Sequence, residues 1–322
     1  MPPLVVSSAA LPFDIRPLLG DAIYLAPSSG HFERDQLMTS LAQAEALISL
    51  LSVQVDEQLL AAAPRLRVVA NVAVGFDNVD IQAATRRGVA VVNTPDVLTE
   101  ATADFAFALL LATARRLVEG DRTVRSRQWT GWDPGQLLGA DVFGTTLGII
   151  GMGRIGRAVA RRASGFAMEI LYLNHHRTPP VEASHGEGPR SVGWEELLLK
   201  SDYLSLHCPL TPETQHIIDR QALRAMKKSA ILVNTARGGC VDEPALAWAL
   251  AAGEIAGAGL DVFANEPAVH PDLLTSDHVV LAPHAGSATT SARKRMVEIC
   301  ANAVRSVLDG HRPPTLLNPE VF

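Results

Sequence analysis

The feature that most constrains the fold is a short apolar run that leads directly into a glycine-rich turn. Thr146–Ile150 has the character of a buried strand, Gly151-Met-Gly-Arg-Ile-Gly156 follows it, and Arg157–Arg162 continues with helical character. In such GxGxxG turns the first glycine permits the tight turn, the second lets a pyrophosphate approach the backbone, and the third lets the helix pack on the strand. A glycine-rich turn without a ligand is the alternative. The strand and helix context favours a dinucleotide site made by Gly151, Gly153, Arg154, Ile155 and Gly156.

Short buried runs alternate with helical stretches on both sides of this turn. Before it, the sequence predicts strands at Leu4–Ser7, Ala22–Leu25, Ala46–Ser49, Val68–Val72 and Val89–Val92, with helices at Gln36–Ala44 and Asp56–Ala62. From it onward, strands are predicted at Thr146–Ile150, Ile170–Leu173, Tyr203–Leu206, Ile231–Asn234, Ala258–Leu260 and Val279–Leu281. Helices are predicted at Arg154–Ser164, Glu195–Lys200, Arg220–Met226, Glu243–Ala252 and Thr289–Leu308.

This alternation is typical of α/β folds with parallel sheets. We expect two doubly wound domains, a flavodoxin-like one and a Rossmann one, with a cleft between them and ligands at the carboxyl ends of the strands. A single long helix, Thr99–Glu119, is expected to join the two series, and Thr178–Gly193 is expected to be a surface loop.

Length and composition narrow the class of protein. The 322 residues suit about two domains of ~150 residues, and a net charge of −6 disfavours non-specific binding to nucleic acid or acidic membranes. Cys208, Cys240 and Cys300 form no CxxC pair, which excludes a disulfide scaffold or a cysteine-rich zinc site and favours a reducing compartment. Neither a signal peptide nor an apolar stretch of ~20 residues is visible. We therefore expect a cytoplasmic protein without a metal, a membrane or a nucleic acid partner.

The end of the second Rossmann strand bears on which dinucleotide binds. NAD sites place an acidic residue there, about 20 residues after the glycines, to bind the ribose hydroxyls. Here the strand ends in Asn174, His175, His176 and Arg177, which offer neutral or cationic donors and no carboxylate. Such groups suit a 2′-phosphate, so the sequence favours NADP, with NAD still possible.

Three polar residues follow the late strands of the second series. Arg237 can hold a carboxylate and a carbonyl oxygen through its planar guanidinium, and His284 can give a proton to a forming alkoxide. Glu266 would orient the imidazole and favour its protonated form. These are the groups needed to reduce a 2-oxo acid by hydride transfer. Spacing alone leaves open whether the three side chains converge.

The chain resembles the D-isomer-specific 2-hydroxyacid dehydrogenase family over nearly its whole length. The matching segments are Val74–Asn78, the glycine-rich turn, His207-Cys-Pro-Leu-Thr211, Asn234–Gly238, Asp261–Phe263, Asn265–Pro267 and Pro283–Gly286. The resemblance implies that Arg237, Glu266 and His284 are catalytic. It also implies that the backbone of Val74 and Gly75 binds the substrate carboxylate together with Arg237 and His284.

The same resemblance implies that Asp261 holds the nicotinamide carboxamide and that Pro209, Thr235 and Ala236 line the cofactor. Thr102, Cys208 and Gly286 are further candidates for cofactor contact. It implies a substrate-binding domain of residues 1–98 and 288–322, to which the last helix returns, and an NADP-binding domain of residues 99–287.

Within the family, the second strand and its basic end look like the glyoxylate/hydroxypyruvate and 2-ketogluconate reductase branch. The leading hypothesis is thus an NADPH-dependent reductase of these small 2-oxo acids. The alternatives are an NAD-dependent dehydrogenase of another D-2-hydroxy acid and a dinucleotide-sensing protein of corepressor type. The segment Thr99–Gly139 resembles the family's dimerisation region and contains Arg115, Arg116, Trp129 and Trp132. A homodimer is therefore expected. The alternative is that both tryptophans belong to the core.

Overall fold

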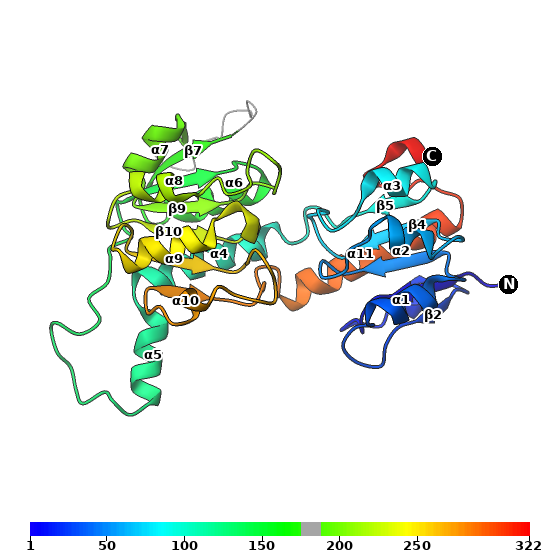
Figure 1. Ribbon diagram of the computed structural model, residues 1–322, viewed down its shortest axis with the longest axis horizontal. Coiled ribbons are helices and arrows are strands. Elements are labelled where there is room, and N and C mark those ends of the chain that lie inside the picture. The colour runs from blue at the N-terminus through cyan, green and yellow to red at the C-terminus, as the bar shows by residue number, and fades with distance from the viewer. Residues whose placement is uncertain (175–187) are drawn as a thin grey trace. The chain divides into compact units, whose positions relative to one another are not determined.

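The computed structural model describes residues 1–174 and 188–322, which divide into two compact units (Figure 1). Unit 1 comprises Met1–Leu98 and Ala288–Phe322, and unit 2 comprises Thr99–Ser287. Among the described residues, no helix combines the length and the apolar character needed to cross a membrane.

Unit 1 is built on a five-stranded parallel sheet. Its order is β2-β1-β3-β4-β5, the arrangement of flavodoxin-like folds. The strands are β1 Leu4–Ser7, β2 Ile23–Leu25, β3 Ala46–Ser49, β4 Val68–Asn71 and β5 Ala90–Val92. The three inner strands β1, β3 and β4 and the edge strand β5 are almost wholly buried, as their runs of Val, Ile, Leu and Ala predict.

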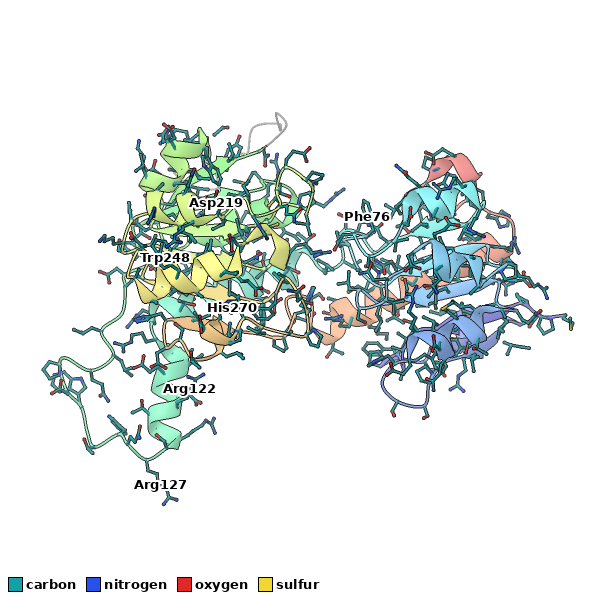
Figure 2. All side chains as sticks on the ribbon, viewed as in Figure 1. Phe76, Arg122, Arg127, Asp219, Trp248 and His270 are labelled. Atoms are coloured by element: carbon teal, nitrogen blue, oxygen red, sulfur yellow. The ribbon has the colours of Figure 1, made fainter. Side chains whose placement is uncertain are left out.

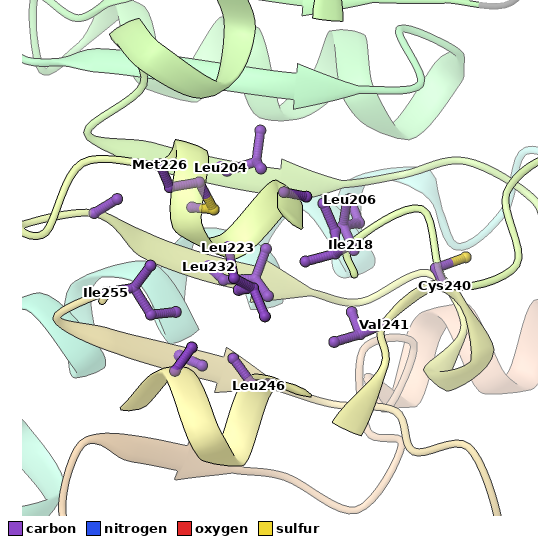
Figure 3. Packing of buried hydrophobic residues seen from close by; sticks show 14 of the residues in the cluster. Leu204, Leu206, Ile218, Leu223, Met226, Leu232, Cys240, Val241, Leu246 and Ile255 are labelled. Carbon is purple, nitrogen blue, oxygen red and sulfur yellow. The ribbon is translucent and has the colours of Figure 1, made fainter. Parts of the chain in front are cut away.

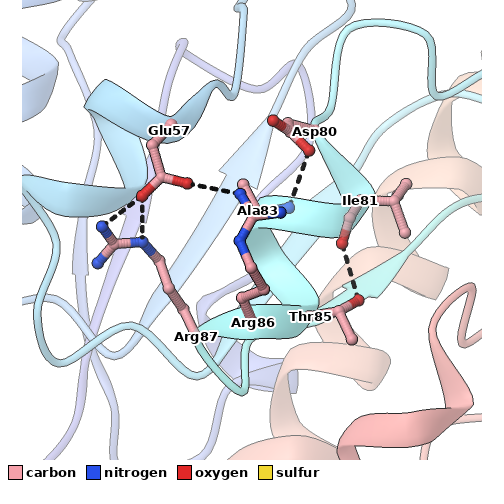
Figure 4. A network of polar contacts seen from close by, with 7 residues as sticks. All are labelled: Glu57, Asp80, Ile81, Ala83, Thr85, Arg86 and Arg87. Atoms are coloured by element: carbon pink, nitrogen blue, oxygen red, sulfur yellow. Dashed lines mark hydrogen bonds and ion pairs between the residues drawn. The ribbon is translucent and has the colours of Figure 1, made fainter.

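The helices of unit 1 are α1 Arg34–Leu41, α2 Glu57–Ala61, α3 Ile81–Arg86 and α11 Thr290–Leu308, with short 3₁₀ turns at Arg16–Leu18 and Pro319–Val321. Asp56 and Asp80 cap α2 and α3, and Glu57 forms ion pairs with Arg86 and Arg87 that tie these two helices together (Figure 4). The last helix, α11, packs on β3 and β4 of unit 1, whereas the strands that precede it belong to unit 2.

Unit 2 is built on a seven-stranded parallel sheet in the order β12-β11-β10-β9-β6-β7-β8, which is the Rossmann order extended by one strand. The strands are β6 Thr146–Ile150, β7 Glu169–Leu173, β8 Arg190–Ser191, β9 Tyr203–Leu206, β10 Ile231–Asn234, β11 Gly257–Leu260 and β12 Val279–Leu281. The expected fold class of two doubly wound parallel sheets is thereby confirmed.

Helices cover both faces of this sheet. The helices of unit 2 are α4 Thr99–Ala114, α5 Leu117–Arg125, α6 Arg154–Ser164, α7 Trp194–Lys200, α8 Arg220–Ala225, α9 Glu243–Ala251 and α10 Pro271–Leu274, of which α5 buries no residue. Side chains alternate along β10. Leu232 packs with α7, α8 and α9 in the cluster of which Figure 3 shows a part, whereas Ile231 and Val233 pack with α4 and α6. Each strand of the sheet centre therefore contributes to two hydrophobic cores.

Two sequence predictions about unit 2 are wrong. The long helix predicted for Thr99–Glu119 ends at Ala114, because Arg116 takes the left-handed conformation (φ 48°) and a separate helix, α5, begins at Leu117. The apolar face of α4 packs on α6 and β11, whereas α5 buries no residue, so the pattern stops where the chain leaves the core.

The predicted loop Thr178–Gly193 contains the short strand β8, and its residues up to 187 lie outside the described part of the chain. Arg190 in β8 forms ion pairs with Glu169 and Glu196. A two-residue exposed strand held by such side-chain contacts has no apolar pattern from which to predict it. The short helices α3 and α10 were also missed, and the other boundaries differ from expectation by a few residues.

Candidate active site

The glycine-rich turn has the geometry that a bound pyrophosphate requires. Gly151 has a φ of +95°, and a Cβ there would lie 2.7 Å from the backbone at His207 and Cys208. A Cβ on Gly156 would lie 2.2 Å from the Gly151 carbonyl oxygen, so only glycine lets α6 approach the turn. At Gly153, the N-cap of α6, a Cβ would meet nothing within 4 Å, which leaves open space at the helix N-terminus beside Arg154 and Ile155. The residues present therefore fit a dinucleotide phosphate.

Asn174 closes this turn from the end of β7. Its Oδ1 accepts a hydrogen bond from the Met152 N–H, and the Gly151 N–H donates to the Leu173 carbonyl at 2.9 Å. The side-chain carbonyl of Asn174 is thus used within the protein to hold the turn. His175, His176 and Arg177 lie outside the described residues.

The segment after β9 forms the wall beside this turn. Cys208 is buried, and Thr214 Oγ1 donates to the Pro209 carbonyl at 2.6 Å. His207 is partly buried, and burial of its imidazole lowers the pKa to about 4. Its Nε2 lies 2.8 Å from Ser205 Oγ, while its Nδ1 has no partner among the described residues.

Asn234 shapes the turn that carries Arg237. Its Nδ2 donates to the Arg237 carbonyl at 2.9 Å, and its Oδ1 accepts from the Ala236 N–H at 3.0 Å. The side chain is 1% exposed, so the turn through Thr235 and Ala236 is fixed from within the protein. The Arg237 Nη1 donates to the Ala236 carbonyl at 2.7 Å. The sequence motif contained Asn234, but no role had been predicted for it.

Glu266 and His284 lie side by side. The Nδ1 of His284 is 2.8 Å from Glu266 Oε2, and the second carboxylate oxygen accepts from the Phe263 N–H at 3.0 Å. Burial opposes ionisation of Glu266, but the hydrogen bonds from His284 and Phe263 and the charges of His284 and Arg237 outweigh it, so its pKa lies below the ordinary value. A carboxylate can only accept, so Nδ1 of His284 donates and Nε2 remains for another partner.

Asp261 holds the turn on which His284 stands. Its two oxygens accept from the N–H groups of Ala285 at 2.6 Å and Gly286 at 2.7 Å. His284 itself has a φ of +52°, a conformation that this turn imposes. Burial raises the pKa of Asp261 in spite of the two hydrogen bonds. A Cβ on Gly286 would lie 3.0 Å from Asp261 Oδ2 and 3.5 Å from Thr102, so these three candidate cofactor residues adjoin one another.

Two residues that had not been predicted position the loop around Glu266. Glu243, at the start of α9, is 8% exposed, and its Oε1 accepts from the Ala264 N–H at 2.7 Å. A Cβ on Gly238 would lie 1.9 Å from the Phe263 carbonyl carbon, so the loop rests directly on this glycine. Neither contact has a local sequence signal, because each joins segments about 20 residues or more apart.

In unit 1, side-chain amides hold the turn after β4. The Asn93 Nδ2 donates to the Val74 carbonyl at 2.8 Å, and the Asn71 Nδ2 donates to the Gly75 carbonyl at 3.0 Å. The carbonyl side of the predicted substrate turn at Val74 and Gly75 is thus fixed by two amides.

The described residues contain no group of three or more His, Cys, Asp or Glu side chains placed to hold a metal ion.

Comparisons with known proteins agree with this geometry. A family model described as the NAD-binding domain of D-isomer-specific 2-hydroxyacid dehydrogenases matches residues 107–286. A glyoxylate reductase from Thermococcus kodakarensis is 52% identical over 299 residues, which are 92% of this chain and 89% of that protein.

Two solved structures are similar over the whole chain. A protein from Thermus thermophilus is 41% identical with a TM-score of 0.90, over 98% of this chain and 99% of the other. An NADPH-dependent glyoxylate/hydroxypyruvate reductase from Sinorhizobium meliloti, solved with NADP and malonate, is 32% identical with a TM-score of 0.84, over 100% of this chain and 98% of the other.

Proposed function

Because the chain belongs to the D-isomer-specific 2-hydroxyacid dehydrogenase family of oxidoreductases, we propose that it reduces glyoxylate and related small 2-oxo acids with NADPH. The resemblance seen in the sequence is confirmed at the level of the family and of an NAD-binding domain. Hydroxypyruvate and 2-ketogluconate are the further substrates proposed.

The observation that carries the proposal is the His284–Glu266 pair beside Arg237 in the unit that contains the glycine-rich turn. A reduction of this kind needs one proton donor and one cation for the oxygen that gains charge. When bound, the reduced nicotinamide supplies the hydride. His284 then gives its Nε2 proton to the carbonyl oxygen, while Glu266 holds the ring through Nδ1.

Arg237 binds the substrate carboxylate and the carbonyl oxygen through its planar guanidinium. In unit 1 the N–H groups of Val74 and Gly75 are the proposed donors to a substrate carboxylate, and in unit 2 Asp261 is the proposed partner of the nicotinamide carboxamide. Unit 1 is accordingly the proposed substrate-binding domain and unit 2 the proposed NADP-binding domain. This division of roles follows from the residues that each unit carries.

The preference for NADPH rests on the end of β7. Asn174 there is neutral, and Arg177 follows it in the sequence. A 2′-phosphate is doubly charged near neutrality, so one hydrogen bond to it from a charged group contributes about 1.5–3 kcal/mol. The similar reductase from Sinorhizobium meliloti, which was solved with NADP, supports the same choice.

The test is kcat/KM with NADPH and NADH for the wild type, Arg177→Ala and Asn174→Asp, with glyoxylate, hydroxypyruvate and 2-ketogluconate as substrates. Arg177→Ala is expected to weaken NADPH use about ten- to a hundredfold and to leave NADH use unchanged. In Asn174→Asp an oxygen can still accept from the Met152 N–H, so the turn survives while the new charge repels the phosphate. A wild type that prefers NADH, or variants that lose both cofactors equally, would refute the cofactor choice.

We also propose that the protein is a homodimer joined through α5 and the segment that follows it. α5 buries no residue and extends from the sheet of unit 2, with Arg122 on it and Arg127 just beyond its end (Figures 1 and 2). Trp132 is 83% exposed, Trp129 53% and Leu117 65%, so the two tryptophans do not belong to the core of the chain. An apolar surface of this kind is typical of a subunit interface. Trp132→Asp is expected to convert a dimer to a monomer in sedimentation, and a monomeric wild type would refute the proposal.

A further inference from the structure

Two free cysteines lie beside each other at the carboxyl edge of the unit 2 sheet. β9 and β10 are paired with Leu206 opposite Asn234, and Cys208 and Cys240 follow these strands. Their sulfur atoms are 4.0 Å apart, and both side chains are buried, Cys208 with 8% exposure and Cys240 with none.

The approach of the two thiols is enforced by the backbone around them. The His216 N–H donates to the Gly239 carbonyl at 2.8 Å, and the Ile218 N–H donates to the Cys240 carbonyl at 3.1 Å. Cys240 stands at the edge of the hydrophobic cluster that includes Ile218 and Val241 (Figure 3). The segment after Cys208 is thus bonded directly to the segment that carries Cys240.

The surroundings also favour a thiolate at Cys240. The contact with the Cys208 sulfur, in which either thiol can donate, and the nearby Arg237 charge outweigh burial and hold the pKa of Cys240 below its ordinary value. Burial and the neighbouring sulfur act in the other direction on Cys208 and raise its pKa. A lowered pKa at Cys240 beside a second sulfur favours oxidation of the pair.

We propose that Cys208 and Cys240 are a redox modification site, a dithiol that a hydroperoxide converts to an intramolecular disulfide with loss of cofactor binding and activity. The loss of activity rests on the proposed function, whereas the formation of the disulfide does not. A thiolate attacks one peroxide oxygen, the O–O bond breaks, and a sulfenic acid forms with release of water or an alcohol. The second sulfur then attacks the first, an S–S bond forms and water leaves. Two thiols are oxidised by two electrons in total, and the peroxide is reduced by the same two.

The disulfide would strain the site on both sides. The sulfurs must move from 4.0 Å to about 2.05 Å apart, so the two side chains and the turns that carry them must together absorb about 2 Å. The Cys208 backbone has little room, since a Cβ on Gly151 would lie 2.7 Å from the Cys208 nitrogen. Cys240 lies three residues after Arg237. A displacement of about 1 Å at such a site costs up to about a hundredfold in rate, so we expect a ten- to hundredfold loss of activity.

The experiment treats the full-length protein with hydrogen peroxide, alkylates the remaining thiols under denaturing conditions and maps the peptides by mass spectrometry without reduction. The expected product is a Cys208–Cys240 cross-link that lacks two hydrogen atoms, with Cys300 still alkylated. In parallel, NADPH binding is titrated and glyoxylate reduction is measured before oxidation, after it, and after treatment with dithiothreitol. Binding and activity are expected to fall together and to recover on reduction.

Cys240→Ser and Cys240→Ala should form no cross-link and keep NADPH binding through the same peroxide dose. Cys300→Ala, which removes a buried thiol in unit 1, should oxidise like the wild type. A wild type that yields no Cys208–Cys240 cross-link, or only an oxidised single cysteine, would overturn the proposal. A cross-linked protein with unchanged NADPH binding would overturn the proposed loss of cofactor binding on oxidation. If the reduced wild type binds NADPH but does not reduce glyoxylate, the proposed function fails while the peptide map and the titration still decide this inference.

Discussion

In unit 1 a network of neutral amides holds the turn after β4, whereas in unit 2 the turns after the late strands carry ionisable groups. After β3 and β4, Asn71 and Asn78 hydrogen-bond to each other, and Ser49 donates to Asn71 at 3.1 Å. After the late strands of unit 2 come Arg237, Glu266 and His284, with two of them in direct contact. The two units share a doubly wound architecture, so the difference lies in the side chains that follow the strands.

The difference separates two tasks. A neutral amide network can fix a turn and aim its N–H groups, but it cannot donate a proton to a forming alkoxide near neutral pH. The set in unit 2 can do so, and its charges must be balanced locally because they are partly buried. We therefore expect substitutions in unit 2 to change turnover and substitutions in unit 1 to change substrate binding and stability.

The largest effect should come from removing the proton donor. His284→Ala is expected to lower kcat by roughly 10²–10⁴-fold, since this is the range for a positioned general acid, while NADPH still binds. Stopped-flow turnover and a fluorescence titration with NADPH measure the two quantities. A near-normal kcat would refute the assignment of His284 as the proton donor. It would also contradict the proposed difference between the two units.

Arg237→Lys keeps the positive charge but loses the planar pair of donors. Both binding of the carboxylate and stabilisation of the alkoxide should weaken, so we expect KM to rise and kcat to fall, about ten- to a hundredfold together in kcat/KM. Steady-state kinetics with glyoxylate check this. A change confined to the KM for NADPH would place Arg237 on the cofactor.

The matching test in unit 1 is Asn78→Ala. The Asn78 Nδ2 donates to the Val53 carbonyl at 2.9 Å and the Leu50 carbonyl at 3.2 Å, and its loss leaves buried acceptors unpaired. We expect the free energy of unfolding to fall by about 1–3 kcal/mol and the KM for glyoxylate to rise, with kcat little changed. A fall in kcat at constant KM would contradict the division of tasks between the units.

Local sequence patterns predict some features of the fold and the site, whereas contacts between distant segments escape them. The turn Gly151–Gly156 and most strands follow from local patterns of apolar residues and glycines, and the structure agrees with them. The helix over Thr99–Glu119 was predicted wrongly because helix propensity continues past the point where the core ends. Asn234 stood inside a known motif, yet its role needed the three-dimensional course of the turn. The Glu243 carboxylate accepts from the N–H of Ala264, which lies 21 residues later in the chain. No pattern in a single sequence reveals such a contact.

A partly buried histidine makes the stability of unit 2 depend on pH. The pKa of His207 is lowered from 6.5 to about 4 by burial, so between these values the unfolded chain takes up a proton that the folded protein does not. The contribution of neutral His207 to the free energy of unfolding is fully present above pH 6.5 and is lost as the pH falls towards 4. We expect protonation of His207 in the unfolded chain to lower the free energy of unfolding by about 2 kcal/mol at pH 5 relative to pH 7. Urea unfolding of the wild type, His207→Gln and the exposed control His278→Gln measures this, and an equal loss in all three would contradict it.

The smallest effect, and the sharpest test of how unit 2 works, is expected from Glu266→Gln. The pKa of Glu266 lies below its ordinary value, so its carboxylate is charged at every pH at which the enzyme would be assayed. Glutamine keeps the shape, and its Oε1 can still accept from the Phe263 N–H, so the loop is retained and only the charge is lost. Without that charge the proton donor His284 loses its ionic partner at Nδ1, and the fall of kcat/KM at high pH should move to lower pH. Glu243→Gln is the matched control, because it removes a buried carboxylate that touches the same loop at Ala264 but not His284. If both variants shift the pH profile equally, or neither does, the carboxylate acts on the loop and not on the proton donor.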